Sequence, residues 1–265
     1  MLTPFNQIAE CRYGKMLYNV NDSYIGRSME VYGEYSDGEV QIFRHLVRAG
    51  DVVVEGGSNI GAHTVPLAQL AGETGMVLAF EPQRLVFQTL CANIALNSLT
   101  NVWPAQAALG ATEGILRAHH FDPRVKNNFG GMSLSIPGTG EEAAVIPLDE
   151  VAPTRCRLIK LDVEGMELEA LRGASEVIRR FRPILYLEAD WPGKSDALIA
   201  HIRSLDYRMF WHEPFMFSPL NFRGNQTNLF DRIVSRNLLC VPSEMPDVLE
   251  GMYLSEPLAP YEPSH

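Results

Sequence analysis

The sequence predicts an α/β fold with a mostly parallel central sheet, helices on both faces and an antiparallel strand pair near its C-terminal end. Three observations lead to this prediction. Between residues 51 and 190, short β-rich runs alternate with segments of helical periodicity. The run DVVVEGG is too apolar for an exposed edge strand, which indicates a sheet covered on both sides. Near the end of the chain, YRMFWHEPFMF and NLLCVPS form two further β-rich runs.

The alternating region supplies the strands and helices in a regular order. Its five predicted strands lie in DVVVEGG, MVLAFEP, VWPAQAAL, RLIKLDVEG and PILYLEA. The first strand leads into a helix from about Asn59, and the second into a helix with Leu90 and Ile94 on its apolar face. One helix carrying Leu168 to Phe181 at near-helical spacing is predicted between the fourth and fifth strands.

The flanking regions divide the chain into three parts. Residues 1–50 are expected to form an N-terminal extension or cap, and Ser36 and Glu39 fit a capping box that starts a helix before the first strand. Residues 51–243 are expected to form the main domain. Residues 244–265 are rich in proline and acidic side chains, so we expect a mobile or draped tail.

The amino-acid composition indicates which partners and which cellular compartment to expect. The 265 residues carry a formal net charge of -10, from 22 basic against 32 acidic residues. This balance leaves no basic excess to neutralise a phosphate backbone, so nucleic acid is not expected as a partner. We find no signal-peptide pattern and no run of apolar residues long enough for a transmembrane segment, and four dispersed cysteines fit a reducing compartment. A soluble, cytoplasmic protein is therefore expected.

A glycine-containing turn follows the first predicted strand. The segment Glu55-Gly56-Gly57-Ser58-Asn59-Ile60-Gly61 permits tight backbone geometry and close approach of a ligand to the main chain. A dinucleotide fingerprint starting at Gly56 would need glycine where Ser58 stands. The anionic Glu55 favours a cationic ligand group, such as the ammonium of S-adenosylmethionine, over a pyrophosphate. The turn therefore indicates an S-adenosylmethionine site more than a nicotinamide site.

A second acid stands at the end of the next strand. Glu81 lies 20 residues beyond Gly61, where a carboxylate can accept both ribose hydroxyls of a nucleoside. At the end of the third predicted strand, Gln106, Ala107 and Ala108 are placed to border an adenine ring. The carboxyl ends of three successive strands thus predict one nucleoside-binding crevice.

At these residues the chain resembles the FkbM-type methyltransferases, over about residues 24 to 242. The matching segments are YIGRSMEVYGEYSDGEV, VVVEGGSNIGAHTVPLA, FEPQRLVFQTLCANIALN, NNFGGMSL and LIKLDVEGMELEALRGA. The resemblance implies a class I methyltransferase (Rossmann-like) fold and S-adenosylmethionine as cofactor. It also implies O-methylation of a sugar, polyketide or other small natural-product hydroxyl. The acceptor itself is not identified.

The resemblance, together with the turn and the strand ends, defines the candidate cofactor-binding residues. These are Glu55, Gly57, Ser58, Asn59, Gly61, His63, Thr64, Glu81, Pro82, Gln83, Gln106 and Ala107. The chain departs from the family pattern at one place, where aspartate followed by valine is common and Glu55-Gly56 stands here. The longer side chain preserves the possible ammonium contact but changes its geometry.

Four further acids stand at the ends of the fourth and fifth predicted strands. Asp162 and Glu164 follow the fourth, and Glu188 and Asp190 follow the fifth. Adjacent strand ends should bring them together as candidate catalytic residues. Crowded carboxylates can raise one another's pKa and provide a general base, or can bind a divalent cation such as Mg²⁺ that polarises an acceptor oxygen. The sequence leaves both possibilities open.

Three functional hypotheses follow from these residues. The first is an S-adenosylmethionine-dependent O-methyltransferase acting on a small-molecule hydroxyl, and the others are a noncatalytic S-adenosylmethionine-binding module and a NAD-dependent oxidoreductase. Among the histidines, His63, His119, His120 and His212 are weaker candidates for a general base. The sequence indicates no oligomeric state.

Overall fold

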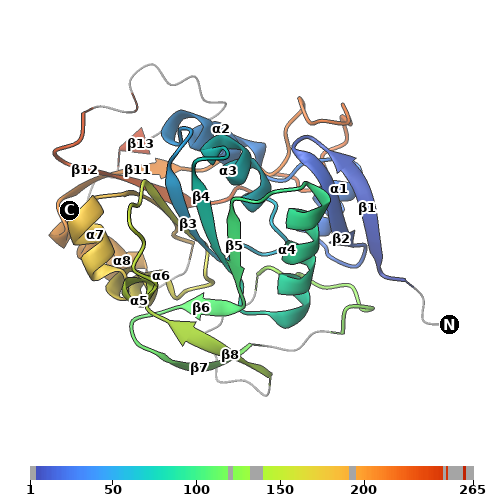
Figure 1. Ribbon diagram of the computed structural model, residues 1–265. Helices are drawn as coiled ribbons and strands as arrows, with labels where there is room; N and C mark the ends of the chain where they lie inside the picture. The colour runs from blue at the N-terminus through green and yellow to red at the C-terminus, as the bar shows by residue number, and fades with distance from the viewer. Residues whose placement is uncertain are drawn as a thin grey trace.

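The computed structural model describes residues 4–118, 122–131, 140–190, 195–246, 249 and 259–260. A central sheet runs through this part of the chain (Figure 1). Its strands in spatial order are β13 (Ala259–Pro260), β11 (Tyr207–His212), β12 (Asn237–Pro242), β10 (Ile184–Glu188), β9 (Leu158–Leu161), β3 (Val52–Gly56), β4 (Met76–Phe80) and β5 (Val102–Ala105).

The pairing directions confirm the predicted fold class. Strands β10, β9, β3, β4 and β5 are mutually parallel, whereas β12 pairs antiparallel with both β10 and β11. The predicted C-terminal pair is therefore present as β11 and β12. Of the predicted tail, β13 adds a short antiparallel pairing to β11, and most of the remaining tail lies outside the described residues. This is the class I methyltransferase arrangement, with one antiparallel strand inserted near the sheet's end.

Helices cover the two faces of the sheet because successive strand residues point to opposite sides. Helices α2 (Asp37–Leu46), α3 (Thr64–Ala71) and α4 (Arg84–Leu96) pack on the face that carries Val53 and Leu158. On the opposite face, which carries Val54 and Ile159, lie α5 (Leu148–Val151), α6 (Glu167–Arg172), α7 (Ser175–Phe181) and α8 (Ser195–Ser204). Strands β3, β4, β5, β9, β10 and β12 thus contribute to two cores. Among the described residues, no helix combines the length and apolar character needed to cross a membrane.

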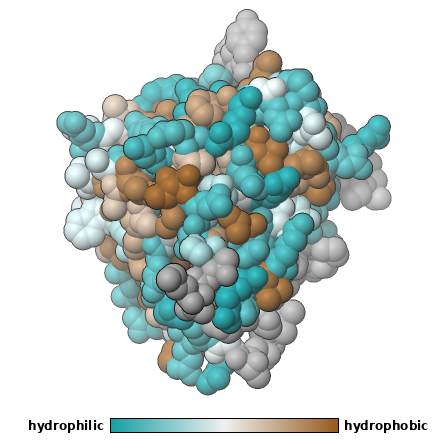
Figure 2. All heavy atoms as spheres, turned by 90° about the vertical axis from the view of Figure 1, so that its right-hand side faces the viewer, coloured by the Kyte–Doolittle hydropathy of each residue, from teal (hydrophilic) through white to brown (hydrophobic). Residues whose placement is uncertain are grey.

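An N-terminal hairpin lies against α4, on the right of Figure 1. It consists of β1 (Asn6–Cys11) and β2 (Gly14–Asn19) and is followed by α1 (Ile25–Val31). Asn93 on α4 bonds both the N–H and the C=O of Leu17, at 2.6 and 3.0 Å, and Asn97 does the same with Lys15, at 3.0 and 2.8 Å. Asn93 also donates to the Ile60 carbonyl at 2.7 Å. The hairpin is thereby tied to the glycine-containing turn. Figure 2 shows this side as largely hydrophilic, with scattered hydrophobic patches.

The predicted third strand is divided between two sheets. Instead of continuing through VWPAQAAL, β5 ends at Ala105, and β6 (Ala107–Leu109) begins a small sheet with β8 (Glu141–Ile146) and β7 (Gly114–Ala118). Residue Gln106 is the exposed junction between them. The prediction of one strand was wrong because the apolar run serves two different pairings, Phe80 with Ala105 and Ala107 with Ala144.

The helix predicted from about Asn59 begins later than expected. α3 starts at Thr64, because Asn59 and Gly61 have φ angles of 49° and 89°, which no right-handed helix accommodates.

The helix predicted between the fourth and fifth strands is broken into α6 and α7 at Gly173. A Cβ at Gly173 would lie 2.0 Å from the Gly110 carbonyl oxygen, so this position requires glycine. Beyond the break, the Asp149 carboxylate accepts the backbone N–H groups of Glu176 and Val177 at 3.0 and 2.9 Å and stabilises the new helix start.

The predicted capping box is also different in the structure. Helix α2 does begin after Ser36, but Ser36 has a φ of 43° and its side chain caps no backbone N–H. Its hydroxyl instead donates to the Glu39 carboxylate at 2.8 Å. The Glu39 side chain is therefore held inside the protein, where it is 3% exposed.

Candidate active site

A cleft of about 1280 Å³ opens at the carboxyl ends of β3, β4, β9 and β10. This is the edge of a parallel sheet where ligands generally bind. Most of the residues singled out in the sequence meet here. The predicted residues that line the cleft are Glu55, Gly57, Ser58, Asn59, His63, Glu81, Pro82, Gln83, Asp162, Glu164, Glu188 and Asp190.

The glycine-containing turn is pinned between two strand ends. The N–H groups of Gly57 and Ser58 both donate to the Phe80 carbonyl at the end of β4, at 2.9 and 3.0 Å. Gly57 has a φ of 75°, and a Cβ there would lie 1.7 Å from the Asp162 carbonyl oxygen beyond β9. Only glycine fits this close approach. At Gly57 the turn therefore has main chain and no side chain beside β9.

The Glu81 carboxylate is held by two backbone amides. It accepts the Asn59 N–H at 3.0 Å and the Gln83 N–H at 2.8 Å, which fixes it beside the turn. Burial raises the pKa of Glu81 to about 7, although both amides act to lower it. Because each carboxylate oxygen has a second lone pair, the side chain retains acceptor capacity toward a ligand.

Glu55 has an internal cation as its neighbour. Lys160 stands opposite Glu55 in the pairing of β3 with β9, and the two residues are 2% and 1% exposed. Glu55 also accepts a hydrogen bond from the Thr64 hydroxyl. Burial raises the pKa of Glu55, while Lys160 and Thr64 act to lower it. For Lys160, burial acts to lower the pKa, but the charges of Asp162 and Glu55 outweigh it and raise the value. The ammonium is thus kept charged.

Lys160 is a residue that we did not single out in the sequence. It borders the cleft, and its Nζ lies 3.5 Å from the Asp162 Oδ2. One feature of the sequence could have identified it: Lys160 is a charged side chain inside the apolar run LIKL. A charge buried in such a strand requires an oppositely charged or hydrogen-bonding partner.

Further buried polar groups lie behind Lys160, beneath α2. Tyr186 is the neighbour of Lys160 on β10, and its hydroxyl lies 2.7 Å from the Nδ1 of His212. Burial raises the pKa of Tyr186, and the charge of Glu39 and a hydrogen bond to it act in the same direction. We call Glu39, Glu55, Lys160, Tyr186 and His212 the buried polar cluster. These polar side chains extend from the bottom of the cleft into the protein core.

The four predicted catalytic acids form one wall of the cleft. Asp162 and Glu164 follow β9, and Glu188 and Asp190 lie at the end of β10. Glu164 has a φ of 56°, an uncommon conformation for a side-chain-bearing residue. Burial raises the pKa of Glu164, and the charges of Asp162 and Glu188 raise it further. Among the described residues, no group of His, Cys, Asp and Glu side chains is arranged to hold a metal ion.

His63 lines the cleft as a buried neutral imidazole. Its ring packs against Tyr35 and Phe43, with ring centroids 5.7 Å apart in each case. Burial lowers the pKa of His63 to about 3, and the charge of Lys160 lowers it further. Its Nε2 has no hydrogen-bond partner in the described part of the protein. His119 and His120 lie outside the described residues.

Four predicted residues do not line the cleft. Gly61 shapes the turn with its φ of 89°, and Thr64 supports Glu55 from the start of α3. Gln106 is exposed and Ala107 is buried in β6, whereas Ala108, predicted with them beside the adenine, borders the cleft.

Other cleft residues come from two segments outside the alternation of strands and helices. Tyr24 and Tyr35 approach from the N-terminal region, and Asn128 from the loop of residues 122–131. Strand patterns do not specify which side chains of these segments reach the cleft.

The parallel sheet, the glycine turn at its carboxyl edge and the acids that surround it define a class I methyltransferase. The family model "Methyltransferase FkbM domain" matches residues 55–209. The chain therefore belongs to the FkbM methyltransferase family. A search of curated proteins found no match.

Several solved structures are similar to the chain at low sequence identity. The FkbM methyltransferase from Methylobacillus flagellatus KT has a TM-score of 0.49 and 17% identity, and the match covers 76% of this chain and 50% of that one. A putative methyltransferase from Streptococcus mutans in complex with SAH has a TM-score of 0.47 and 11% identity, covering 77% and 96% of the two chains. A putative rRNA methylase from Clostridium thermocellum has a TM-score of 0.47 and 13% identity, covering 79% and 95%.

Proposed function

We propose that the chain binds S-adenosylmethionine in the cleft and transfers its methyl group to a hydroxyl of a small-molecule acceptor. The observation that carries this proposal is the Glu81 carboxylate, fixed by two backbone amides beside the glycine-containing turn. A carboxylate in this place suits the two hydroxyls of a ribose. Gly57 and Asn59 then border the amino-acid part of the cofactor, and Pro82, Gln83 and Ala108 its adenine.

The charge of the cleft supports this cofactor over a dinucleotide. Six carboxylic acids line it, whereas the one lysine among its described residues is already partnered by Asp162. A sulfonium and an ammonium are stabilised by such surroundings, and a pyrophosphate is repelled. The donor set therefore fits S-adenosylmethionine and does not fit NAD.

The acid wall is proposed to serve the acceptor. Bound S-adenosylmethionine would supply a methyl group on a positively charged sulfur. This sulfur would be the leaving group when an acceptor oxygen attacks the methyl carbon in line. Asp162 and Glu188 are placed to hold the acceptor hydroxyl and to take its proton as the O–CH₃ bond forms and the S–CH₃ bond breaks. Glu164 and Asp190 extend this wall, and Tyr24 and Tyr35 cover the cleft from the N-terminal region, which we propose acts as its cap.

Replacing Glu81 with glutamine tests the cofactor assignment. We expect the affinity for S-adenosylhomocysteine to fall about 10- to 100-fold, because a charged acceptor of hydrogen bonds contributes roughly 1.5–3 kcal/mol. Calorimetric titration measures this, with NAD titrated in parallel. Glu113→Gln, at an exposed acid outside the cleft, serves as the control. Unchanged binding in Glu81→Gln, or binding of NAD alone, would contradict the proposal.

The affinity for S-adenosylhomocysteine is also expected to depend on pH. Glu81 has a pKa of about 7 and must be ionised to accept both ribose hydroxyls strongly. Affinity should therefore rise with pH and be about tenfold lower at pH 6 than at its plateau near pH 8, since one pKa unit corresponds to a tenfold change. Titrations across this range in parent and Glu81→Gln proteins provide the measurement. A pH dependence that survives in the variant would assign it to another group.

A further inference from the structure

The segment between β11 and β12 forms one end of the cleft. Residues 213–236 connect these two strands, and we call them the arm. The N–H of Ser235 donates to the Pro214 carbonyl at 3.0 Å. In the same way, the N–H of Met216 donates to the Ile233 carbonyl at 3.1 Å. The arm therefore begins and ends as a continuation of the strand pair. Its residues that line the cleft are Met216, Ile233, Val234 and Ser235.

Backbone contacts place the arm beside the acid wall. Glu188, at the end of β10, is the register partner of Asn237, the first residue of β12. One residue further along, the Ala189 N–H donates to the Arg236 carbonyl at 3.0 Å. The last residues of the arm therefore lie next to the end of β10, and they share the cleft with Glu188 and Asp190.

The strand order β12, β10, β9, β3, β4 sets the order of groups along the cleft. Glu81 and Gln83, the proposed cofactor contacts, follow β4, whereas the four acids follow β9 and β10 and the arm ends at β12. The arm is thus separated from Glu81 by four strand spacings of about 4.8 Å each. An acceptor hydroxyl held by Asp162 and Glu188 therefore lies between the cofactor and the arm.

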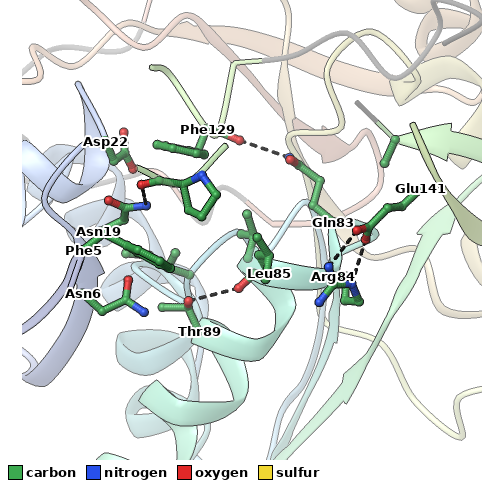
Figure 3. A pocket seen from close by; sticks show the side chains of 14 residues that line it. Phe5, Asn6, Asn19, Asp22, Gln83, Arg84, Leu85, Thr89, Phe129 and Glu141 are labelled. Carbon is green, nitrogen blue, oxygen red and sulfur yellow. Dashed lines mark hydrogen bonds and ion pairs between the residues drawn. The ribbon is translucent and has the colours of Figure 1, made fainter. Parts of the chain in front are cut away.

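The other end of the cleft, which is proposed to hold the cofactor, leads away from the acids. There the Gln83 amide donates to the Phe129 carbonyl at 3.1 Å (Figure 3). Beyond Gln83 lies a separate hollow, whose lining includes the buried Asp22. Among the described residues, that lining contains none of the four acids of the wall. The side of the acids that faces the arm is therefore left for the body of the acceptor.

The arm presents mainly hydrocarbon to the cleft. We call the surface formed by Met216, Ile233 and Val234 the arm face, and none of these side chains carries a charge or an N–H or O–H group. The hydroxyl oxygen of the adjoining Ser235 already accepts a hydrogen bond from the Asn237 side chain at 2.9 Å. Ile233 is 40% exposed, so a ligand that covers it removes apolar surface from water. The arm face therefore favours an alkyl or aryl group.

The arm is anchored to the N-terminal region and so forms a fixed wall. It is the orange segment beside α1 in Figure 1. Phe230 is buried and stacks on Tyr24, which also lines the cleft, with ring centroids 6.0 Å apart. The Tyr32 hydroxyl donates to the Thr227 carbonyl at 2.8 Å and accepts the Leu229 N–H at 2.8 Å. These contacts hold the arm in place before any ligand binds.

We propose that the arm face binds an uncharged alkyl or aryl group of the methyl acceptor, whose hydroxyl lies between Asp162 and Glu188. This assignment rests on the proposed function. It restricts the acceptor to alcohols and phenols that carry hydrocarbon close to the reacting hydroxyl. Small, fully polar hydroxyl compounds leave the arm face exposed to water, and anionic groups are repelled by the acid wall.

A series of 4-alkylphenols tests the proposal, because it joins a hydroxyl to hydrocarbon of increasing length. Phenol, 4-ethylphenol and 4-butylphenol are titrated into protein saturated with S-adenosylhomocysteine, and their NMR signals give the dissociation constants. We expect the affinity to rise about fourfold for each added methylene, as for burial of hydrocarbon. In the same concentration range, myo-inositol should show no saturable binding. Equal affinities across the series, or no saturable binding of 4-butylphenol, would overturn the proposal.

Two variants of the arm locate the alkyl group. Ile233→Asn places a polar side chain in the arm face and should weaken the binding of 4-butylphenol about tenfold, with a smaller loss for phenol. Leu229→Asn makes the same change at a side chain that is 44% exposed and does not line the cleft. It should leave the affinities unchanged. Equal effects of the two variants would place the phenols outside the arm face and overturn the proposal.

Titration with S-adenosylhomocysteine alone separates this inference from the proposed function. The parent and both variants should bind it with the same affinity, which also shows that the variants are folded. If they do so while 4-butylphenol fails to bind or fails to distinguish the variants, the assignment of the arm face is refuted and the cofactor site stands. If the parent does not bind S-adenosylhomocysteine, the proposed function is refuted, and the acceptor assignment with it.

Discussion

Replacing Lys160 with methionine is expected to lower the free energy of unfolding by about 3–5 kcal/mol at pH 7, the usual cost of removing one partner from a buried ion pair. Methionine keeps the length and apolar stem of the side chain but removes the charge. Glu55 and Asp162 then lose the cation that Lys160 holds beside them. Urea unfolding of parent and variant measures the difference.

The double variant Lys160→Met, Glu55→Gln separates charge from packing. It should recover part of the lost stability, because a neutral amide needs no cation. The loss of unfolding free energy caused by Lys160→Met should also be smaller at pH 5 than at pH 8. Burial already raises the pKa of Glu55 in the parent, and a carboxyl with a raised folded-state pKa stabilises the fold at low pH and loses this contribution as pH rises. A deficit independent of pH and of Glu55 would show that packing dominates.

Replacing Gly57 with alanine is expected to abolish detectable binding of S-adenosylhomocysteine. The new Cβ would lie 1.7 Å from the Asp162 carbonyl oxygen, so the turn or the end of β9 must move. Both segments border the cleft, and displacements of about 1 Å can cost 100-fold in function. The positive φ adds roughly 1–2 kcal/mol of strain. Calorimetry and urea unfolding measure the two effects.

Gly50→Ala provides the matched control for this variant. Gly50 has a comparable φ of 92°, but the nearest atom to an added Cβ is the Thr74 hydroxyl at 3.6 Å, an ordinary contact. It should therefore show the strain alone and bind S-adenosylhomocysteine normally. Equal losses of binding in both variants would mean that general destabilisation, and not the clash at the turn, disables the cleft.

The sheet and most of the cleft could be predicted because they depend on local patterns. Apolar runs such as that of β3 mark strands buried on both faces, and parallel strands place their carboxyl ends at one edge. Glu55, Glu81, Asp162 and Glu188 stand at or just beyond such ends, so their proximity follows from strand order alone.

The remaining features depend on contacts between distant segments. The partnership of Lys160 with Glu55 and Tyr186 needs the register of three strands, which periodicity does not specify. The helix break at Gly173 arises from the nearby Gly110 carbonyl. The hollow bordered by Phe129 forms only where residues 122–131 meet the hairpin and the start of α4. Each is a property of packing in three dimensions.

The two asparagines that hold the hairpin have a consequence for how copies of the protein meet in solution. Along its outer edge, β2 would otherwise expose the N–H and C=O groups of Lys15 and Leu17, which form a template for an added strand. The side-chain amides of Asn93 and Asn97 take the place of that strand, one peptide-like group for each residue. The protein thereby closes this edge without lengthening its sheet, and another molecule cannot extend the hairpin there into an intermolecular aggregate.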